Sequence, residues 1–170
     1  SGLTYGFMQA NPVDAEYRNR GVEFPGADGV LREWVQVLSE LPLICQPGSA
    51  WNYSVSTDVL GRLVEVWSGQ DLQEFFQNRI FEPLGMADTG FHVASENHSR
   101  FATLYAPPGG GDLSNVGRTS KSDGAASKTT GLTVQDRGSE SRFLQPATLH
   151  SGGGGLVGSM TDYARFCQML

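Results

Sequence analysis

The sequence is poor in lysine, and the two that it holds, Lys121 and Lys128, do not complete a nucleophile motif. Arg118 and Ala125 stand three residues before them, so the chain has no Ser-x-x-Lys. No serine has a glycine two residues to each side, which excludes the Gly-x-Ser-x-Gly elbow. The sequence therefore lacks both of these motifs for an activated serine.

Basic residues and long apolar runs are also scarce. The chain has 12 basic and 18 acidic residues and a net charge of −6. Such a surface repels phosphate backbones, so we expect no nucleic-acid partner. No apolar run approaches the roughly 20 residues that cross a bilayer, so we expect no membrane insertion. Cys45 and Cys167 have apolar neighbours, which favours buried free thiols over catalytic ones.

Motifs for cofactors and metals are missing as well. The run Gly152 to Gly155 is not followed by the Lys-Ser/Thr of a phosphate-binding loop. The spacing of His92, His98 and His150 matches no zinc pattern, and no cysteine pair stands beside them. We therefore expect neither a cofactor nor a metal.

What the sequence does contain is helical periodicity. Three stretches before residue 90, at about 30–41, 57–68 and 71–80, carry apolar residues at steps of three and four, which predicts amphipathic helices. Their predicted core positions include Leu31, Trp34 and Leu38 in the first stretch, Leu60, Leu63, Val64 and Trp67 in the second, and Leu72, Phe75, Phe76 and Ile80 in the third.

The ends of these helices have recognisable signals. Ser56 and Asp71 are predicted N-caps of the second and third helices, Gly69 lies just beyond the second, and Pro83 is expected to break the third. A last helix is predicted after Ser159, which with Asp162 has the spacing of a capping box; its apolar face is Met160, Tyr163, Ala164 and Cys167.

Residues 107–142 differ from the rest, since they are rich in Gly, Ser, Thr and charge. This composition predicts a long loop, which is unusual inside a compact domain. The pattern as a whole predicts a mainly α fold with little or no sheet. We expect a single helical domain over 1–170, divided into a helix-rich part (1–106), the polar loop (107–142) and a Gly-rich turn with a terminal helix (143–170).

One stretch points to a family. "PGSAWNYSVSTDVLGRLVEVWSGQDLQEFFQNRIFEPLGMADTGF", residues 47–91, resembles the helical region of the serine β-lactamase-like hydrolases. This group holds class C β-lactamases, low-molecular-weight penicillin-binding proteins and family VIII carboxylesterases. The resemblance extends to "SGLTYGF" at the start and "SGGGGLVGSMTDYARFCQML" at the end. It implies the helical domain of that fold.

The resemblance also implies roles for particular residues. The family builds its site from Ser-x-x-Lys, Tyr-x-Asn and a Lys-Thr-Gly-like strand, and only the second motif has a counterpart here. By position, Tyr53 is the tyrosine that transfers protons. Ser54 and Val55, which follow it, and Gly154 of the Gly-rich run are expected to contact the substrate. Valine stands where asparagine is usual and cannot hydrogen-bond a substrate amide, which favours esters over β-lactams.

A physical estimate shows what such a tyrosine needs. For a phenol to act as a base near pH 7, its pKa must fall by about three units, which is roughly 4 kcal/mol in favour of the phenolate. A helix N-terminus supplies about 0.3–1 kcal/mol, whereas one ammonium at about 4 Å supplies on the order of 4 kcal/mol. The tyrosine therefore needs a lysine, and Lys121 and Lys128 both lie in the predicted loop.

Two functional hypotheses follow. In the first, the chain is the helical part of a serine hydrolase that works on a small ester or amide through an acyl-enzyme, and it is inert without the remaining α/β portion. In the second, it is a free-standing, non-catalytic helical module that self-associates, for example as a homodimer. An ordinary boundary position for Tyr53 is the structural alternative to a catalytic one.

Overall fold

The computed structural model of the chain describes residues 1–22, 29–106 and 131–170. Its α-helices are α1 (Pro12–Asn19), α2 (Leu31–Ser39), α3 (Ser56–Ser68), α4 (Leu72–Phe76), α5 (Glu82–Leu84) and α6 (Met160–Met169). The shorter elements are the 3-10 turns η1 (Gly6–Met8), η3 (Ser95–Arg100), η5 (Gly138–Glu140) and η6 (Arg142–Leu144), the π-helical segment η2 (Gln77–Phe81) and the strands β1 (Leu104–Ala106) and β2 (Thr133–Asp136). The prediction of a mainly helical fold with little sheet is confirmed.

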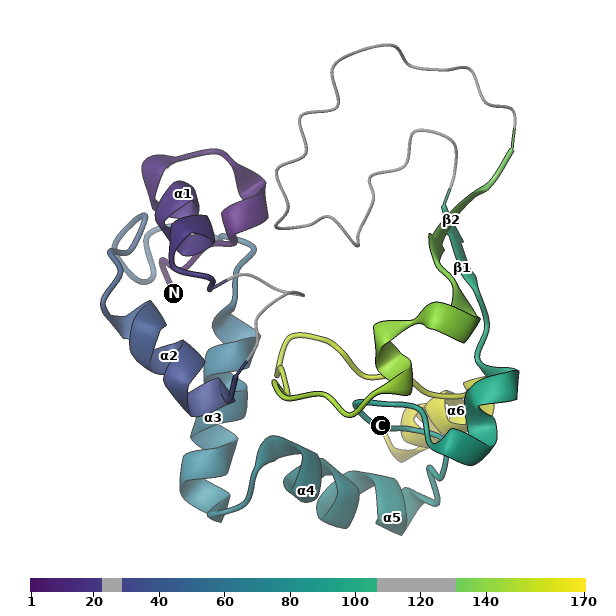
Figure 1. Cartoon of the computed structure of the whole chain (residues 1–170). Helices are drawn as coiled ribbons and strands as arrows, with labels where there is room; N and C mark the ends of the chain where they lie inside the picture. Colours follow the sequence, from purple (N-terminus) through teal and green to yellow (C-terminus); the bar gives the residue numbers. More distant parts are fainter. Residues whose placement is uncertain (23–28, 107–130) are drawn as a thin grey trace.

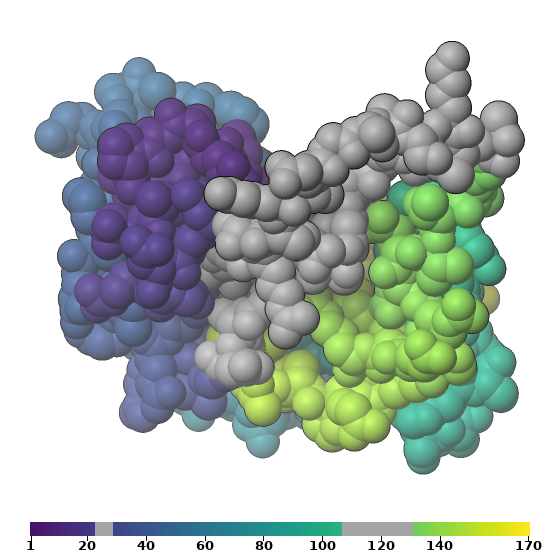
Figure 2. All heavy atoms as spheres, turned by 45° about the horizontal axis from the view of Figure 1, so that its top comes forward, coloured from purple at the N-terminus to yellow at the C-terminus, as the bar shows by residue number. Residues whose placement is uncertain are grey.

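The helices form two groups joined by α4 and α5. Figure 1 shows α1, α2 and α3 at one side, α4 and α5 along the base, and the two strands with α6 at the other side. Figure 2, in which the top of Figure 1 comes forward, shows the N-terminal residues in purple on one side and the green residues on the other, with yellow-green residues between them at the bottom. The Gly-rich segment after η6 also connects the two groups, because Ser151 hydrogen-bonds to Asp58 of α3.

The main core lies in the first group. α2 contributes the predicted Leu31, Trp34 and Leu38, all at most 5% exposed. The buried cluster is completed by residues from other segments, namely Tyr5, Tyr17, Val22, Val55, Leu72 and Phe91. The apolar periodicity of residues 30–41 therefore predicted the correct face of α2.

Helix α1 was not among the predicted helices, although its start carries a strong signal. The Asn11 side chain accepts from the backbone N–H of Asp14, and the Asp14 carboxylate accepts from the N–H of Asn11. Pro12 occupies the first turn, where its missing N–H needs no partner. Asp14 also accepts from the Thr4 hydroxyl at 2.7 Å, which ties α1 to the N-terminal segment.

Helix α3 has the predicted length, but only part of its predicted apolar stripe faces the core, where Val64 packs against the buried cluster. Leu60 and Trp67 are 57% and 78% exposed, whereas the buried positions of the helix are Asp58 and Gly61. The first cap was also wrong: Val55 precedes the helix without a side-chain cap bond. Gly69 ends it in the left-handed conformation, as predicted.

The third helical stretch continues past the predicted break at Pro83. Asp71 caps α4 by accepting from the N–H of Glu74, as predicted. The π-helical segment η2 ends at Phe81, so Pro83 falls in the first turn of α5, where proline is tolerated. The helix stops instead at Gly85, whose φ of 65° is left-handed.

The predicted loop over 107–142 contains a strand. Residues 107–130, with both lysines, lie outside the described part of the chain, but β2 pairs with β1 in antiparallel register, with Tyr105 opposite Val134. Two 3-10 turns, η5 and η6, follow it. The segment Thr133–Asp136 is too short for an alternation of apolar and polar residues to predict a strand. It is extended because it pairs with β1.

Helix α6 begins where predicted but presents its apolar face to the outside. Ser159 accepts from the N–H of Asp162, while the Asp162 carboxylate bonds to Asp88 and Thr89 rather than back to the cap. The predicted face of α6, formed by Met160, Tyr163, Ala164 and Cys167, is exposed. The expectation of two buried thiols was therefore wrong for Cys167, and Cys45 is half-buried.

Across the described residues, no helix combines the length and apolar character that a membrane crossing requires.

Candidate active site

Tyr53 lies in the extended segment that leads into α3. Its side chain is 56% exposed, and its ring centroid lies 4.9 Å from that of Tyr5 with the rings tilted by 45°. Tyr5 in turn stacks on Phe7 at 4.8 Å. The phenol of Tyr53 is therefore accessible on one side and supported on the other by aromatic rings from the start of the chain.

The residue after Tyr53 takes part in a chain of hydroxyls. The Oγ of Ser54 lies 2.6 Å from the Oγ of Ser56, which lies 2.6 Å from the Oγ of Ser1. Ser56, predicted to cap α3, instead links these two hydroxyls. The arrangement places Ser54 beside Tyr53 with its hydroxyl already in a hydrogen bond.

Val55 is fully buried. Its side chain has no exposed surface and packs in the main core, and its backbone N–H donates to the carbonyl of Thr4 at 3.3 Å. The structure thus gives the side chain of Val55 a packing position that fixes the backbone two residues after Tyr53. Its predicted contact with substrate stays a prediction.

The Gly-rich run is brought to the same end of α3 by a buried carboxyl group. Asp58, 2% exposed, accepts from the Ser151 hydroxyl and, at 3.2 Å, from the backbone N–H of Gly153. Ser151 Oγ also accepts from the N–H of Gly154 at 3.1 Å. The Gly-rich run with Gly154 is therefore held beside the first turn of α3, the helix that Tyr53 precedes.

Burial controls the protonation of two groups near Tyr53. Desolvation raises the pKa of Tyr5 to about 12, and the nearby Asp58 and Tyr53 act in the same direction. Burial also raises the pKa of Asp58 above its ordinary value of 3.8, against the hydrogen bonds from Ser151 and Gly153. The second carboxyl oxygen of Asp58, Oδ2, is buried without a partner.

Sequence reasoning missed Tyr5, Asp58 and Ser151. Asp58 stands in the first turn of a helix, where an acidic residue is ordinarily explained by the helix dipole. Ser151 directly precedes the glycines, and a hydroxyl at that place can accept from the following N–H groups, which is the signal that could have identified it.

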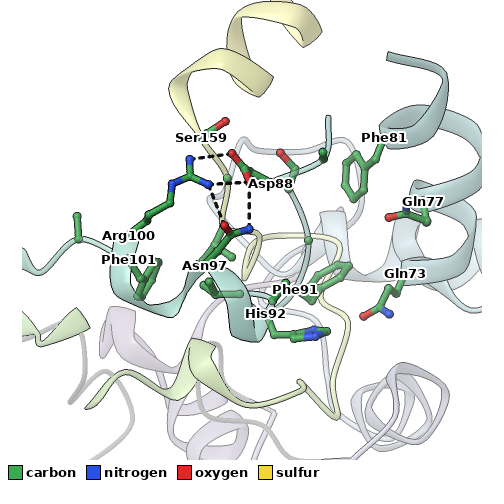
Figure 3. A pocket seen from close by; sticks show the side chains of 18 residues that line it. Gln73, Gln77, Phe81, Asp88, Phe91, His92, Asn97, Arg100, Phe101 and Ser159 are labelled. Carbon is green, nitrogen blue, oxygen red and sulfur yellow. Dashed lines mark hydrogen bonds and ion pairs between the residues drawn. The ribbon is translucent and has the colours of Figure 1, made fainter. Parts of the chain in front are cut away.

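A separate cavity of about 380 Å³ lies between η2, η3 and the start of α6 (Figure 3). Asp88 and Arg100 form an ion pair at 3.0 Å at its rim, joined by Asn97, which lies 3.2 Å from Asp88. Arg100 lowers the pKa of Asp88 below its usual range. These polar groups satisfy one another.

The histidines are not assembled into a metal site in the described residues, where no group of three or more His, Cys, Asp or Glu side chains could hold an ion. His98 contacts the carbonyl of Val93 at 3.1 Å, and His150 lies 3.6 Å from Asp71 and against the ring of Phe91.

This geometry defines a class of protein. A half-exposed tyrosine precedes the main helix of an α-helical unit, and a Ser-Gly-rich loop is pinned to the same helix, as the resemblance to the serine β-lactamase-like hydrolases implies. The profile of the Beta-lactamase family matches residues 1–170. The chain belongs to the Beta-lactamase family.

Several relatives align over the full chain. A protein of Mycobacterium tuberculosis is 31% identical over 170 residues, which are 100% of this chain and 36% of that protein. Esterase EstB of Burkholderia gladioli is 33% identical over 176 residues, covering 100% of this chain and 42% of the esterase. The chain thus spans about two fifths of the length of these relatives.

Solved structures share the fold. The structure of EstCE1, a hydrolase with promiscuous acyltransferase activity, superposes with a TM-score of 0.66 over 96% of this chain and 41% of its own, at 24% identity. The predicted resemblance is therefore confirmed for both family and fold.

Proposed function

We propose that the chain is the helical part of an ester-cleaving serine hydrolase, in which Tyr53 transfers protons while a serine outside these 170 residues forms the acyl-enzyme. The observation that carries the proposal is the placement of Tyr53. Its phenol is 56% exposed, yet its backbone is fixed by the buried Val55. An accessible acid–base group on a rigid support is what general acid–base catalysis requires.

The neighbouring residues favour an ester as substrate. Val55 offers no amide that could bind a substrate amide, and its side chain is directed into the core. Ser54 and Gly154 are proposed to line the substrate, the first through its hydroxyl and the second through its backbone. EstB, which is an esterase by name, supports the same substrate class.

The chemistry proposed for Tyr53 follows the acyl-enzyme route. Tyr53 accepts the proton of the attacking serine hydroxyl as the serine–acyl bond forms, and then donates it to the leaving alcohol as the ester bond breaks. Water repeats the sequence to release the acid. A lysine ammonium beside the phenol is required, and the two lysines of this chain lie outside the described residues.

The test is a chimera in which residues 1–170 replace the matching region of esterase EstB. We expect the chimera to hydrolyse short-chain p-nitrophenyl esters and Tyr53→Phe to lower kcat by about 10²–10⁴-fold. Tyr163→Phe, at a tyrosine that is 64% exposed on α6, is the matched control and should have no effect. Full activity of Tyr53→Phe would contradict the proposal.

The isolated chain gives a second test. We expect it to show no covalent labelling by a fluorophosphonate probe and no ester turnover, because it lacks the activated serine. Labelling of the chain alone would mean that the nucleophile is within these residues.

A non-catalytic, self-associating module is the second candidate, and it is favoured by exposed apolar side chains on two helices. Trp67 on α3 is 78% exposed, and Met160 on α6 is 84% exposed. Apolar groups of this kind commonly mark interaction surfaces. Light scattering that reports a dimer, with Met160 protected from peroxide oxidation, would support this candidate, whereas a monomer would contradict it.

A further inference from the structure

The support beneath Tyr53 is built from the first seven residues, with Tyr5 at its centre. The ring of Tyr5 is 4% exposed and lies between Phe7, at 4.8 Å, and Tyr53, at 4.9 Å. Tilted and offset aromatic pairs at these separations are favourable and orient one ring relative to the other. Tyr5 therefore restricts the orientation of the Tyr53 ring from its buried side.

Backbone hydrogen bonds hold the two tyrosines in this relation. The N–H of Val55, two residues after Tyr53, donates to the carbonyl of Thr4, directly before Tyr5. Another bond runs from the N–H of Ile44 to the carbonyl of Gly2. The N-terminal segment is thus fastened on the same side as Tyr53, so the contact between the rings does not depend on side-chain packing alone.

The hydroxyl of Tyr5, a residue that is 4% exposed, is suited to donate rather than to accept. Its pKa of about 12 results first from burial, then from the charge of Asp58, and then from Tyr53 through charge and a side-chain hydrogen bond. The raised pKa keeps the proton on the Tyr5 oxygen, which can therefore act as a hydrogen-bond donor. The charge of Asp58, which is buried in the first turn of α3, also disfavours charge on Tyr5.

We propose that Tyr5 is a positioning residue for Tyr53, whose oxygen receives a hydrogen bond from the Tyr5 hydroxyl whenever Tyr53 carries negative charge. The inference rests on the proposed role of Tyr53 as proton-transfer group. Hydrogen bonds to ionised oxygens are roughly twice as strong as neutral ones, so the bond strengthens when the proton has left. Tyr5 does this without contacting the substrate.

The first experiment measures the reactivity of Tyr53 in the 170-residue chain. N-acetylimidazole acetylates phenolates, and peptide mass mapping gives a separate rate for each tyrosine. Tyr5→Phe removes the donor and keeps the ring. We expect acetylation of Tyr53 to slow by about threefold or more. The loss of a hydrogen bond to the charged oxygen lowers the phenolate population by about tenfold. The remaining phenolate is more nucleophilic without that bond, which offsets part of the loss.

Controls separate hydrogen bonding from packing. Tyr163, 64% exposed on α6, should acetylate at the same rate in both proteins. If the acetylation rate of Tyr53 is unchanged in Tyr5→Phe, the proposal is overturned. This holds even if Tyr5→Leu changes the rate, because the ring of Tyr5 and not its hydroxyl would then be responsible.

The reciprocal variant gives an independent readout. Tyr53→Phe changes a half-exposed side chain and removes two of the causes that raise the pKa of Tyr5, so Tyr5 should ionise at lower pH than in the unaltered chain. The ¹³Cζ signal of labelled tyrosine reports this directly. An unchanged midpoint for Tyr5 overturns the proposal.

Both measurements need no turnover. If the esterase chimera remains fully active with Tyr53→Phe, only the proposed function is overturned. If neither tyrosine responds to substitution of the other, only the role of Tyr5 is overturned. In an active chimera, Tyr5→Phe should lower kcat with KM unchanged.

Discussion

Gly152 lies against Gly61 with no space for a side chain between them. A Cβ on Gly152 would lie 3.1 Å from the Cα of Gly61 and 2.2 Å from the carbonyl oxygen of Thr57. This contact presses the Gly-rich loop onto the first turns of α3. It brings Ser151 and Gly153 within hydrogen-bonding distance of Asp58.

Gly152→Ala should therefore destabilise the fold. The new methyl group meets backbone atoms, which cannot move aside as a flexible side chain can, and overpacking of this kind costs about 1–3 kcal/mol. Urea unfolding measures the change. Gly131→Ala is the matched control, because nothing lies within 4 Å of a Cβ at Gly131. Equal midpoints for the two variants would contradict the close contact.

The same substitution at Gly61 should cost less. Its Cβ would meet Leu72 Cδ2 at 3.0 Å, the end of a side chain that can adjust, and the Cα of Gly152 at 3.2 Å, a much looser backbone contact than the 2.2 Å at Gly152. Alanine in a helix interior also gains about 1 kcal/mol over glycine. We expect Gly61→Ala to lie between Gly152→Ala and the control in the same urea series. A larger loss than at Gly152 would contradict this order.

Asp58 should make stability depend on pH. Because burial raises its pKa in the folded state above 3.8, the folded chain binds this proton more tightly than the unfolded chain. The stabilising contribution is full below about pH 3.8 and is lost as pH rises through the folded pKa. Asp58→Asn removes the titration. As pH rises, the unfolding free energy of the unaltered chain should therefore fall relative to that of Asp58→Asn. If the two unfolding free energies change in parallel with pH, the assignment is contradicted.

Asp162 should be more important for stability than an ordinary helix cap. Its Oδ2 accepts from the N–H of Asp88 at 2.7 Å and the hydroxyl of Thr89 at 2.9 Å. Asp162→Ala leaves both donors unpaired, at about 1–3 kcal/mol. Asp71→Ala, at the N-cap of α4, is the comparison and should cost about 1 kcal/mol. Thermal unfolding measures the loss of stability in both variants. A smaller loss for Asp162→Ala than for Asp71→Ala would contradict the expectation.

The two cysteines should differ in reactivity. Cys167 is exposed on α6, whereas Cys45 is half-buried and accepts a hydrogen bond from Asn52 at 3.3 Å. An aromatic disulfide reagent should therefore react with Cys167 well before Cys45 in the folded chain. Cys167→Ser should remove the fast phase and Cys45→Ser the slow one. A single phase shared by both thiols would contradict the difference in exposure.

The periodicity of apolar residues predicted α2 well and α3 only in its length. In α2 the core side chains are themselves apolar, so their spacing identifies the buried face. In α3 the inward positions are Asp58 and Gly61, one a carboxyl group that needs hydrogen bonds and the other a residue without a side chain. Neither contributes to an apolar pattern, and of the predicted stripe Val64 packs against the core whereas Leu60 and Trp67 are exposed.

The position of Tyr53 could be found from a motif, but its surroundings could not. The contact with Tyr5 and the link from Asp58 to Ser151 join segments that are far apart in the sequence. No local pattern encodes such pairs, because they result from how the helices pack. The strand β2 was missed for the same reason, since its partner β1 lies on the other side of residues 107–130 in the sequence.

The bond between Asp58 and Ser151 joins positions 93 residues apart, which has a consequence for the order of assembly. Helices with local contacts form quickly, whereas contacts that close long loops are entropically costly and come late. The Gly-rich loop should therefore dock onto α3 only after that helix has formed. In refolding kinetics, protection of the N–H of Gly153 from hydrogen exchange should arise after protection within α3.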